Sequence, residues 1–382
     1  MRVLILGGDG YLGWPTAMHL SRRGHDVTVL DNYFARKAVE ELDLPYLFPV
    51  PDLHERADAW RGKTGREIAT LIGDAADPAV LREAFEKVRP EAVVHYAEQP
   101  SAPYSMLGQR AALFTLKNNL ATTLNVAYAV RDVVPGCHIV KLGTMGEYGT
   151  PNIDIEEGWL DIEHKGRKDR FLFPRQAGSL YHTTKVNDTD LLYFYVRTWD
   201  LAVTDLMQGP VYGLFTDEMD SDIALASHFS YDEVFGTVLN RFIVQAVAGV
   251  PLTVYGKGGQ TRGYLNIRDT MQCLCLAVEN PAKAGEMRIY NQFTETFSVN
   301  DLAQKVKDAA GSIGIDVKIR NIENPRVEAE EHYYNPVHRG LRELGLEPHS
   351  LTGNVLLGML EAVQRHAGAI RKNIILPRAK WK

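Results

Sequence analysis

A glycine-rich stretch near the start of the chain constrains its fold more than any other feature. The apolar run Val3 to Leu6 has the composition of a buried parallel strand. Gly7, Gly10 and Gly13 follow it, and apolar residues then recur at helical spacing from Tyr11 to Arg23. Strand, glycine turn and helix in this order are typical of a dinucleotide-binding fold, in which the helix N-terminus faces the phosphates of the cofactor.

A second strand from Asp26 to Leu30 ends at Asp31, about 20 residues beyond the glycines. A carboxylate at this point binds the ribose hydroxyl groups and repels a 2′-phosphate, so the sequence predicts NAD rather than NADP as the cofactor. The residues expected to contact the cofactor are Gly7, Asp9, Gly10, Tyr11, Leu12, Gly13, Asp31, Asn32, Arg36, Asp74, Asn119, Tyr181 and Lys185.

Strands and helices alternate through the first half of the chain. We predict further strands at 69–72, 92–96, 138–142 and 202–206, and helices at 78–88, 104–131 and 177–199. This order predicts an α/β fold with a doubly wound parallel sheet, a Rossmann fold, and a smaller C-terminal substrate lobe.

The expected domain limits follow from where this alternation breaks. We assign residues 1–208, with returning segments at about 237–250 and 264–291, to the dinucleotide-binding domain. The smaller substrate-binding lobe is assigned residues 209–236, 251–263 and 292–382. Residues 34–66 are rich in charge and contain three prolines, so we expect a long loop that folds over the cofactor or the substrate.

Composition limits the class of protein. The chain has 382 residues, of which 45% are hydrophobic, enough for a large core and two lobes. A net charge of −6 gives no electrostatic footprint for nucleic acid. No apolar run reaches membrane-spanning length and the chain enters a strand directly, so we expect a cytoplasmic enzyme without membrane insertion.

Three cysteines offer no disulfide framework. Cys273 and Cys275 have the spacing of metal ligands, but they lie in an apolar helical segment without a neighbouring ligand set. We interpret both as small core residues and expect no bound metal.

Tyr181 and Lys185 lie four residues apart, on one face of the expected helix 177–199. An ammonium close to a phenol favours the phenolate, so we expect the pKa of Tyr181 to fall towards neutrality. Such a phenol can take a proton from a hydroxyl group while hydride leaves the same carbon. The pair therefore points to oxidation of an alcohol by the bound cofactor.

Several longer segments carry a family resemblance. These are Gly143 to Gly158, Tyr255 to Leu265, Asn324 to Asn335 and Glu98 to Met106. Over essentially its whole length the chain resembles the UDP-sulfoquinovose synthase family, a branch of the extended short-chain dehydrogenases/reductases. The resemblance implies an NAD-dependent conversion of UDP-glucose and sulfite to UDP-sulfoquinovose.

The mechanism implied by the resemblance stores a hydride on the cofactor. Tyr181 removes the proton of the glucose 4-hydroxyl, and the resulting 4-keto group acidifies C5. Loss of the C5 proton and the 6-hydroxyl gives a 4-keto-5-ene, sulfite adds at C6, and the hydride returns to C4. Lys185 lowers the tyrosine pKa and holds the nicotinamide ribose.

The segment after strand 138–142 supplies a third catalytic element, because Thr144 offers a hydroxyl to orient the substrate. In related sugar-nucleotide 4,6-dehydratases the next two residues are Asp and Glu, but here they are Met145 and Gly146. Glu147 and His182 remain as candidate proton carriers. The alternatives are a structural hydrogen bond in the turn for Glu147 and packing against the lid for His182. The expected catalytic set is Thr144, Tyr181, Lys185, Met145, Glu147 and His182.

We expect Arg262 and Arg326 to clamp the two substrate phosphates through bidentate hydrogen bonds. The full expected substrate-binding set is Gln99, Ser101, Tyr104, Thr144, Gln208, Gln260, Arg262, Tyr264 and Arg326.

Two residues depart from the family pattern, and Pro100 is the one that keeps another function open. Pro100 stands where we expect an arginine that anchors sulfite, and Met207 stands where we expect asparagine. A UDP-sugar 4-epimerase or 5,6-dehydratase that does not add sulfite is therefore an alternative. A more remote one is an NAD-bound regulatory protein. By the superfamily resemblance we also expect a homodimer formed through helices 104–131 and 177–199, with a sulfite-donating partner protein as an open question.

Overall fold

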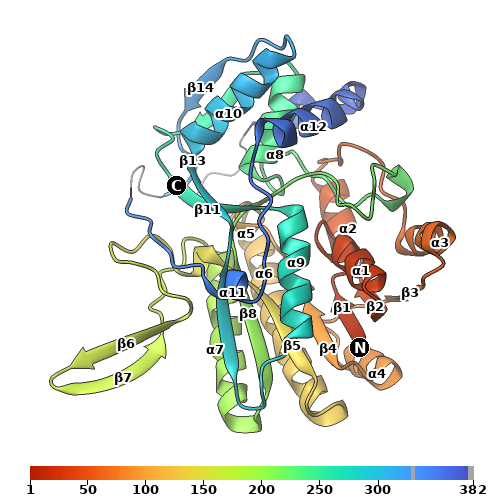
Figure 1. The fold of residues 1–382 in the computed structure, drawn as a ribbon, viewed down its shortest axis with the longest axis vertical. Helices are drawn as coiled ribbons and strands as arrows, with labels where there is room; N and C mark the ends of the chain where they lie inside the picture. Colours follow the sequence, from red (N-terminus) through yellow and green to blue (C-terminus); the bar gives the residue numbers. More distant parts are fainter. Residues whose placement is uncertain (328–331, 377–382) are drawn as a thin grey trace.

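A seven-stranded parallel sheet forms the centre of the computed structural model, which describes residues 1–327 and 332–376 (Figure 1). The strand order is β12-β8-β5-β4-β1-β2-β3. The strands are β1 (Arg2–Leu6), β2 (Asp26–Asp31), β3 (Ile68–Ile72), β4 (Ala92–His95), β5 (His138–Thr144), β8 (Ala202–Gln208) and β12 (Met287–Gln292). The order reverses between β1 and β4, so a crevice for ligands is expected at the carboxyl ends of these strands. The predicted doubly wound sheet is confirmed.

Helices cover both faces of the sheet because successive strand residues point to opposite sides. Val3 and Ile5 of β1 pack with α1 (Gly13–Arg22) and α9 (Ile267–Glu279). Leu4 and Leu6 face a second cluster built from α4 (Pro78–Val88), α6 (Gln109–Val133) and α7 (Leu180–Trp199). The predicted helix 104–131 is divided, since a short α5 (Ala102–Ser105) ends before Gly108 and α6 begins after it.

The expected long loop at 34–66 is wrong, because most of this segment is helical. It forms α2 (Phe34–Glu41) and α3 (Leu53–Thr64), with the three prolines in the link between them. Asp52 and Glu55 start α3 with a reciprocal capping box. Only a narrow stripe of α3 is buried, comprising Leu53, Arg56 and Trp60. With so few apolar residues on this face, the sequence shows no clear hydrophobic periodicity of a helix.

A smaller lobe stands above the carboxyl ends of the strands (Figure 1). Its core joins α8 (Val238–Val247), α10 (Val299–Ser312) and α12 (Gly353–Gln364). The expected return of 237–250 to the central sheet is therefore wrong, since α8 packs within this lobe. By contrast, α9 and β12 do rejoin the sheet domain. The lobe also contains β10 (Leu252–Tyr255) paired with β14 (Ile319–Ile322), and a sheet of β9 (Val211–Tyr212), β11 (Thr261–Asn266) and β13 (Glu295–Ser298).

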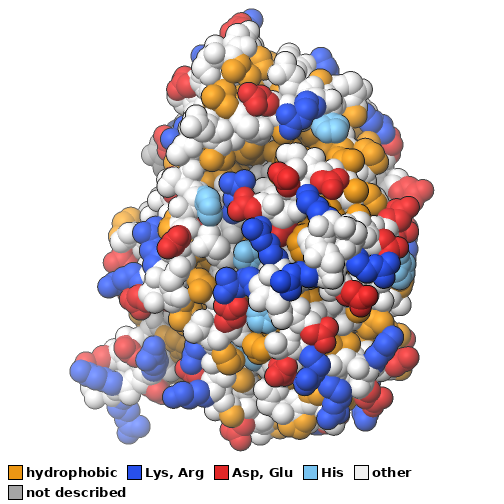
Figure 2. Space-filling view, turned by 45° about the vertical axis from the view of Figure 1, so that its right-hand side comes forward, with side chains coloured by type: hydrophobic (Ala, Val, Ile, Leu, Met, Phe, Trp, Pro, Cys, Tyr) orange, Lys and Arg blue, Asp and Glu red, His pale blue; other side chains and the backbone are white. Residues whose placement is uncertain are grey.

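A hairpin of β6 (Trp159–His164) and β7 (Arg167–Leu172) projects from the body beside α7 (Figure 1). Charged side chains gather on it at the lower left of Figure 2. The remaining short elements are η1 (Met145–Glu147), η2 (Ile223–Leu225), α11 (Gly340–Glu343), η3 (Ala367–Ala369) and η4 (Lys372–Ile374). Among the described residues, no helix combines the length and apolarity that a membrane crossing needs. Residues 328–331 of the expected motif 324–335, and 377–382 of the expected lobe, lie outside the described residues.

Candidate active site

The glycine-rich loop after β1 packs so closely against neighbouring backbone that two of its positions have no space for a side chain. Gly7 adopts a φ of 88°, and a Cβ atom there would lie 2.8 Å from the carbonyl carbon of Tyr96. A Cβ atom at Gly13 would collide with the Gly7 carbonyl oxygen. Both positions therefore require glycine, and the loop leads directly into the N-terminus of α1.

A cavity of about 880 Å³ opens between this loop and the smaller lobe. Its wall contains most of the expected cofactor residues, namely Gly7, Gly10, Tyr11, Leu12, Gly13, Asp31, Asn32, Asp74 and Tyr181. Its substrate side contains Ser101, Thr144, Met145, His182, Gln208, Gln260, Arg262, Tyr264 and Arg326. One cavity thus brings together groups that are distant in the sequence, at the carboxyl ends of β1, β4, β5 and β8.

Asp31 ends β2 at the wall of the cavity. Its carboxylate accepts hydrogen bonds from the backbone N–H groups of Asp9 and Tyr33, at 2.9 and 2.7 Å. Burial, and then the negative charge of Asp9, raise the pKa of Asp31 to about 6. The group remains ionised at neutral pH, in the form that binds ribose hydroxyl groups and repels a 2′-phosphate.

Asp9 and Arg36 do not reach the cavity wall, which corrects their expected role as direct cofactor contacts. Arg36 forms a bidentate pair with Asp9, with both N–O distances 2.8 Å. Arg56 of α3 and His228 of the smaller lobe contact the same carboxylate. Burial opposes ionisation, but hydrogen bonds from His228 and Arg36 hold the pKa of Asp9 well below its ordinary value. Asp9 therefore fastens the glycine-rich loop to α3 and to the smaller lobe.

Tyr181 and Lys185 occupy the first two turns of α7, which begins where the Ser179 hydroxyl accepts a hydrogen bond from the backbone of His182. The Lys185 ammonium lies 6.0 Å from the centre of the Tyr181 ring and donates to the Leu142 carbonyl oxygen at 2.6 Å. It also forms an ion pair of 2.8 Å with Glu98.

The residues around Tyr181 act against the expected lowering of its pKa. Burial, followed by the negative charges of Glu98 and Glu147, raises the pKa of this phenol. The positive charge of Lys185 is matched by the neighbouring Glu98, so it does little to favour the phenolate.

Glu147 is fully buried and points away from the cavity. Its carboxylate lies 3.3 Å from the Lys141 ammonium and accepts a hydrogen bond from Thr189 at 3.1 Å. It also accepts from the Thr144 backbone at 3.3 Å, which stabilises the turn of η1. The expectation that Glu147 carries protons to the substrate is therefore corrected in favour of the structural alternative.

His182 does reach the cavity, where its imidazole lies over Gly146. A Cβ atom at Gly146 would meet the ring carbons Cδ2 and Cε1 at 2.5 and 2.7 Å. The ring thus fills the space beside the position at which a 4,6-dehydratase has its glutamate. Burial, with the positive charges of Arg326 and Arg262, lowers the pKa of His182 to about 3. The imidazole is neutral at pH 7 and can accept a proton.

Four further expected contact residues lie behind the wall instead of on it, namely Lys185, described above, and Gln99, Tyr104 and Asn119. Asn119 exchanges hydrogen bonds with the backbone of Gln99 and donates to Thr184 of α7 at 3.0 Å. The Gln99 side chain bonds to Ser101 and Thr115. Tyr104 packs its ring against Phe34, Phe114 and Phe235. These side chains brace the loop after β4 against α6 and α7, so they act on the site through its scaffold.

The sequence reasoning missed several residues of the cavity wall. Those with polar side chains include Glu98, Asn118, Thr237, Asn240, Arg241 and Tyr255. Arg241 is buried on α8 and donates to the Tyr255 hydroxyl at 2.8 Å. The sequence did carry a signal, because Asn240, Arg241 and Gln245 interrupt the apolar residues of α8, and buried polar residues require partners or a ligand.

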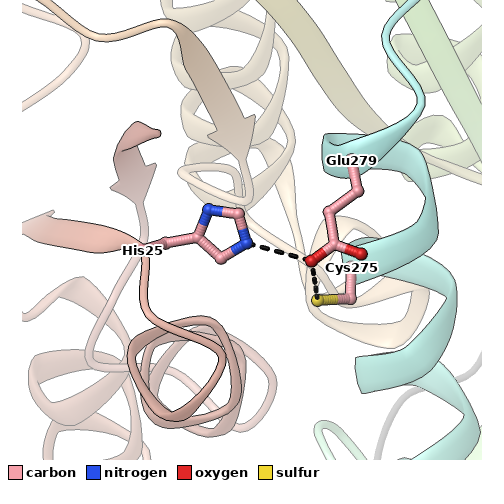
Figure 3. A group of neighbouring side chains, drawn as sticks. All are labelled: His25, Cys275 and Glu279. Carbon is pink, nitrogen blue, oxygen red and sulfur yellow. Dashed lines mark hydrogen bonds and ion pairs between the residues drawn. The ribbon is translucent and has the colours of Figure 1, made fainter.

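The cysteine pair is confirmed as buried in the core, with Cys273 and Cys275 on α9. The expectation that no ligand set lies near is corrected, since His25 and Glu279 flank Cys275 (Figure 3). Glu279 already pairs with Arg23 at 2.9 and 2.7 Å and with His25 at 3.1 Å. Burial raises the pKa of Cys275 to about 12, so the thiol stays protonated and the group is an ion-pair cluster.

The fold, the glycine-rich loop and Asp31 at the end of β2 are those of an NAD-binding enzyme. Residues 3–291 match the NAD dependent epimerase/dehydratase family. Among curated relatives, UDP-sulfoquinovose synthase from Spinacia oleracea chloroplasts is 50% identical over 381 residues, covering 100% of this chain and 79% of the relative. UDP-sulfoquinovose synthase from Sulfolobus acidocaldarius is 46% identical over 385 residues, covering 100% and 98%. The chain belongs to the UDP-sulfoquinovose synthases of the NAD dependent epimerase/dehydratase family.

Solved structures agree on the fold. UDP-glucose 4-epimerase from Bifidobacterium longum, in complex with NAD+ and UDP, aligns with a TM-score of 0.72 at 19% identity. The alignment covers 97% of this chain and 100% of that one.

Proposed function

We propose that this enzyme converts UDP-glucose and sulfite to UDP-sulfoquinovose with NAD as a recycled cofactor. One observation carries the proposal beyond family membership. Thr144 and Tyr181 border the same cavity as His182, whose imidazole lies over Gly146. The site therefore keeps the groups that oxidise a hydroxyl, but replaces the acid and base of a dehydratase with Met145, Gly146 and a histidine.

In the proposed reaction, the Tyr181 phenol exchanges one proton with the glucose 4-hydroxyl, and Thr144 orients that hydroxyl. Bound NAD+ would supply a hydride acceptor and a positive charge, and that charge would favour the Tyr181 phenolate, which burial and the negative charges of Glu98 and Glu147 disfavour. The Tyr181 phenolate accepts the proton of the 4-hydroxyl when C4 is oxidised, and the phenol returns this proton when C4 is reduced. The wall residues Asp31 and Gly10 suit the ribose and pyrophosphate of this cofactor.

His182 is the proposed acceptor of the C5 proton, which the 4-keto group makes acidic. Its neutral imidazole borders the cavity, whereas the Glu147 carboxylate does not. Arg262 and Arg326 both lower the pKa of His182. Substrate phosphates that pair with these arginines would weaken that effect, so substrate binding would make His182 a stronger base.

The nucleotide end of the substrate is proposed to bind under the smaller lobe, at residues assigned to 209–236, 251–263 and 292–382. Arg262 and Arg326 border this part of the cavity, together with Gln260 and Tyr264. Arg241 of α8 joins them as a third cation on the wall. Three guanidinium groups at one end of a cavity suit the two charges of a pyrophosphate.

Pro100 favours one second candidate, a UDP-sugar epimerase or 5,6-dehydratase that adds no sulfite. Pro100 borders the cavity and offers no donor to an oxyanion. Incubation of the NAD-loaded enzyme with UDP-glucose, with and without sulfite, separates the two. The synthase forms a product roughly 64 mass units heavier than the substrate, and only when sulfite is present. A 4-epimer or a dehydrated product that forms regardless of sulfite would select the second candidate.

We also propose a homodimer formed through α6 and α7. The outer faces of these helices expose large apolar side chains, namely Leu113, Leu124, Tyr128 and Phe194. Such a patch is what a four-helix dimer interface would bury. Light scattering after gel filtration tests this, because a mass near 42.7 kDa would mean a monomer. A cytoplasmic location and a sulfite-donating partner stay expectations from the sequence.

A further inference from the structure

A buried carboxylate stands directly behind the proposed catalytic lysine. Glu98 lies in the loop after β4, and both of its carboxylate oxygens are inaccessible to solvent. One oxygen lies 2.8 Å from the Lys185 ammonium, and the other lies 3.4 Å from the His95 ring. The sequence interpretation gave Glu98 no role.

Titratable groups face Glu98 from every neighbouring element. His95 comes from β4, and it is held by Thr123 of α6 at 3.1 Å. Lys141 comes from β5. The groups on α7 are Tyr181, Lys185 and Asp188. Beyond Lys141 lie Glu147 and Asp205, at 3.3 and 3.1 Å from its ammonium.

The charges in this cluster can be assigned from burial and contact. Burial, and then the negative charge of Glu98, raise the pKa of Asp188 well above its ordinary value, which favours the neutral form of Asp188. Burial opposes ionisation of Glu98, but the positive charge of Lys185, with its ammonium 2.8 Å away, holds the pKa of Glu98 below the ordinary value. Burial lowers the pKa of His95 to about 4, so that ring is neutral at pH 7. Glu98 is therefore the anion that matches Lys185.

We propose that Glu98 is a positioning residue that aims the Lys185 ammonium and offsets its positive charge beside Tyr181. The inference rests on the proposed function, because it concerns the charges that surround Tyr181, the proposed base. Two contacts hold the ammonium in place, the Glu98 carboxylate at 2.8 Å and the Leu142 carbonyl oxygen at 2.6 Å. With its charge matched, Lys185 alone does not ionise the phenol.

This arrangement makes the phenol depend on a further positive charge in the cavity. His182 lies beside Tyr181 on the wall, with ring centres 5.2 Å apart, and its ring is neutral, while the negative charge of Glu98 disfavours the phenolate. The oxidised nicotinamide ring would supply this positive charge. Glu98 would thus link ionisation of Tyr181 to the oxidised state of the cofactor.

The test compares Glu98→Gln with two matched variants in the NAD-loaded enzyme. Glu98→Gln removes the charge with little change of shape. Glu98→Asp keeps the charge, and Asp188→Asn replaces a neutral carboxyl with a neutral amide in the same cluster. One readout is the pH dependence of the rate at which bound NAD is reduced by UDP-glucose. The other is the tyrosinate absorbance that disappears in Tyr181→Phe, which needs no turnover.

We expect Glu98→Gln to move the Tyr181 midpoint to lower pH by about one unit or more, in both readouts. Glu98→Asp and Asp188→Asn should leave the midpoint unchanged. An unmoved midpoint in Glu98→Gln, or an equal downward shift in Asp188→Asn, overturns the inference. If Glu98→Gln does not fold, a downward shift in either matched variant still overturns it. Failure of the wild-type enzyme to reduce bound NAD would instead count against the proposed function, and the absorbance readout would still decide the role of Glu98.

Discussion

Gly146→Ala isolates the role of His182, because it adds one methyl group directly under the imidazole. The new Cβ atom would lie 2.5 Å from Cδ2 and 2.7 Å from Cε1 of the ring. Ordinary carbon contacts are about 3.5 Å, so the ring must withdraw by about 1 Å. Misplacement of a catalytic group by this distance typically costs about 10²-fold in rate.

The fold should tolerate this substitution. Gly146 lies in the turn of η1 and does not have a positive φ, so alanine can adopt its backbone conformation. The imidazole borders the cavity and has space to move. We therefore expect the free energy of unfolding to change by no more than about 1 kcal/mol.

The assay separates two stages of the reaction. Reduction of bound NAD by UDP-glucose depends on Thr144 and Tyr181 and should change little. Formation of the sulfonated product depends on removal of the C5 proton and should fall about 100-fold. Gly178→Ala is the matched control, since a Cβ atom there meets the Nδ1 atom of His182 at 3.8 Å, an ordinary contact. Retention of more than about half the product rate in Gly146→Ala would refute the role given to His182.

Three further predictions concern neighbouring groups. Tyr181→Phe should abolish product formation while NAD stays bound through gel filtration, and activity above about 10% would remove the phenol as the base. Arg326→Ala should raise the apparent KM for UDP-glucose with kcat nearly unchanged, as expected for lost uniform binding, and an unchanged KM would remove Arg326 from the phosphate clamp. His182→Asn should make the free energy of unfolding fall less as the pH is lowered. The folded pKa of His182 is about 3 against 6.5 for an ordinary histidine, so between these values the unfolded chain binds the proton and stability falls as pH falls. Urea unfolding at pH 7 and pH 4.5 measures this, and equal acid losses in both proteins would contradict it.

The local signals in the sequence were strong where backbone and hydrophobic pattern decide the structure. The run Val3 to Leu6 and the three glycines predict a strand, a turn and a helix, because few other conformations suit them. Asp31 was predictable in the same way, since its distance from the glycines fixes its place at the end of β2.

The sequence could not show which way a polar side chain points. Glu147 and His182 both lie within a few residues of other expected site residues in the sequence. In the structure, Glu147 pairs with Lys141 of β5, whereas His182 lies over Gly146 at the cavity. Asp9 looked like a cofactor contact, but Arg56 and Arg36 pull its carboxylate into the core. Arg56 lies in a segment whose charge concealed a helix. Such outcomes depend on long-range ion pairs, which spacing along the chain does not reveal.

The most direct test of the account is the fate of the hydrogen at C4. UDP-glucose carrying deuterium at C4 should give, in the presence of sulfite, a sulfonated product that keeps the deuterium at C4, because the same hydride leaves and returns. Mass spectrometry of the product and its fragments measures both features at once. A sulfonated product without the label, or a labelled product without sulfur, would contradict the account.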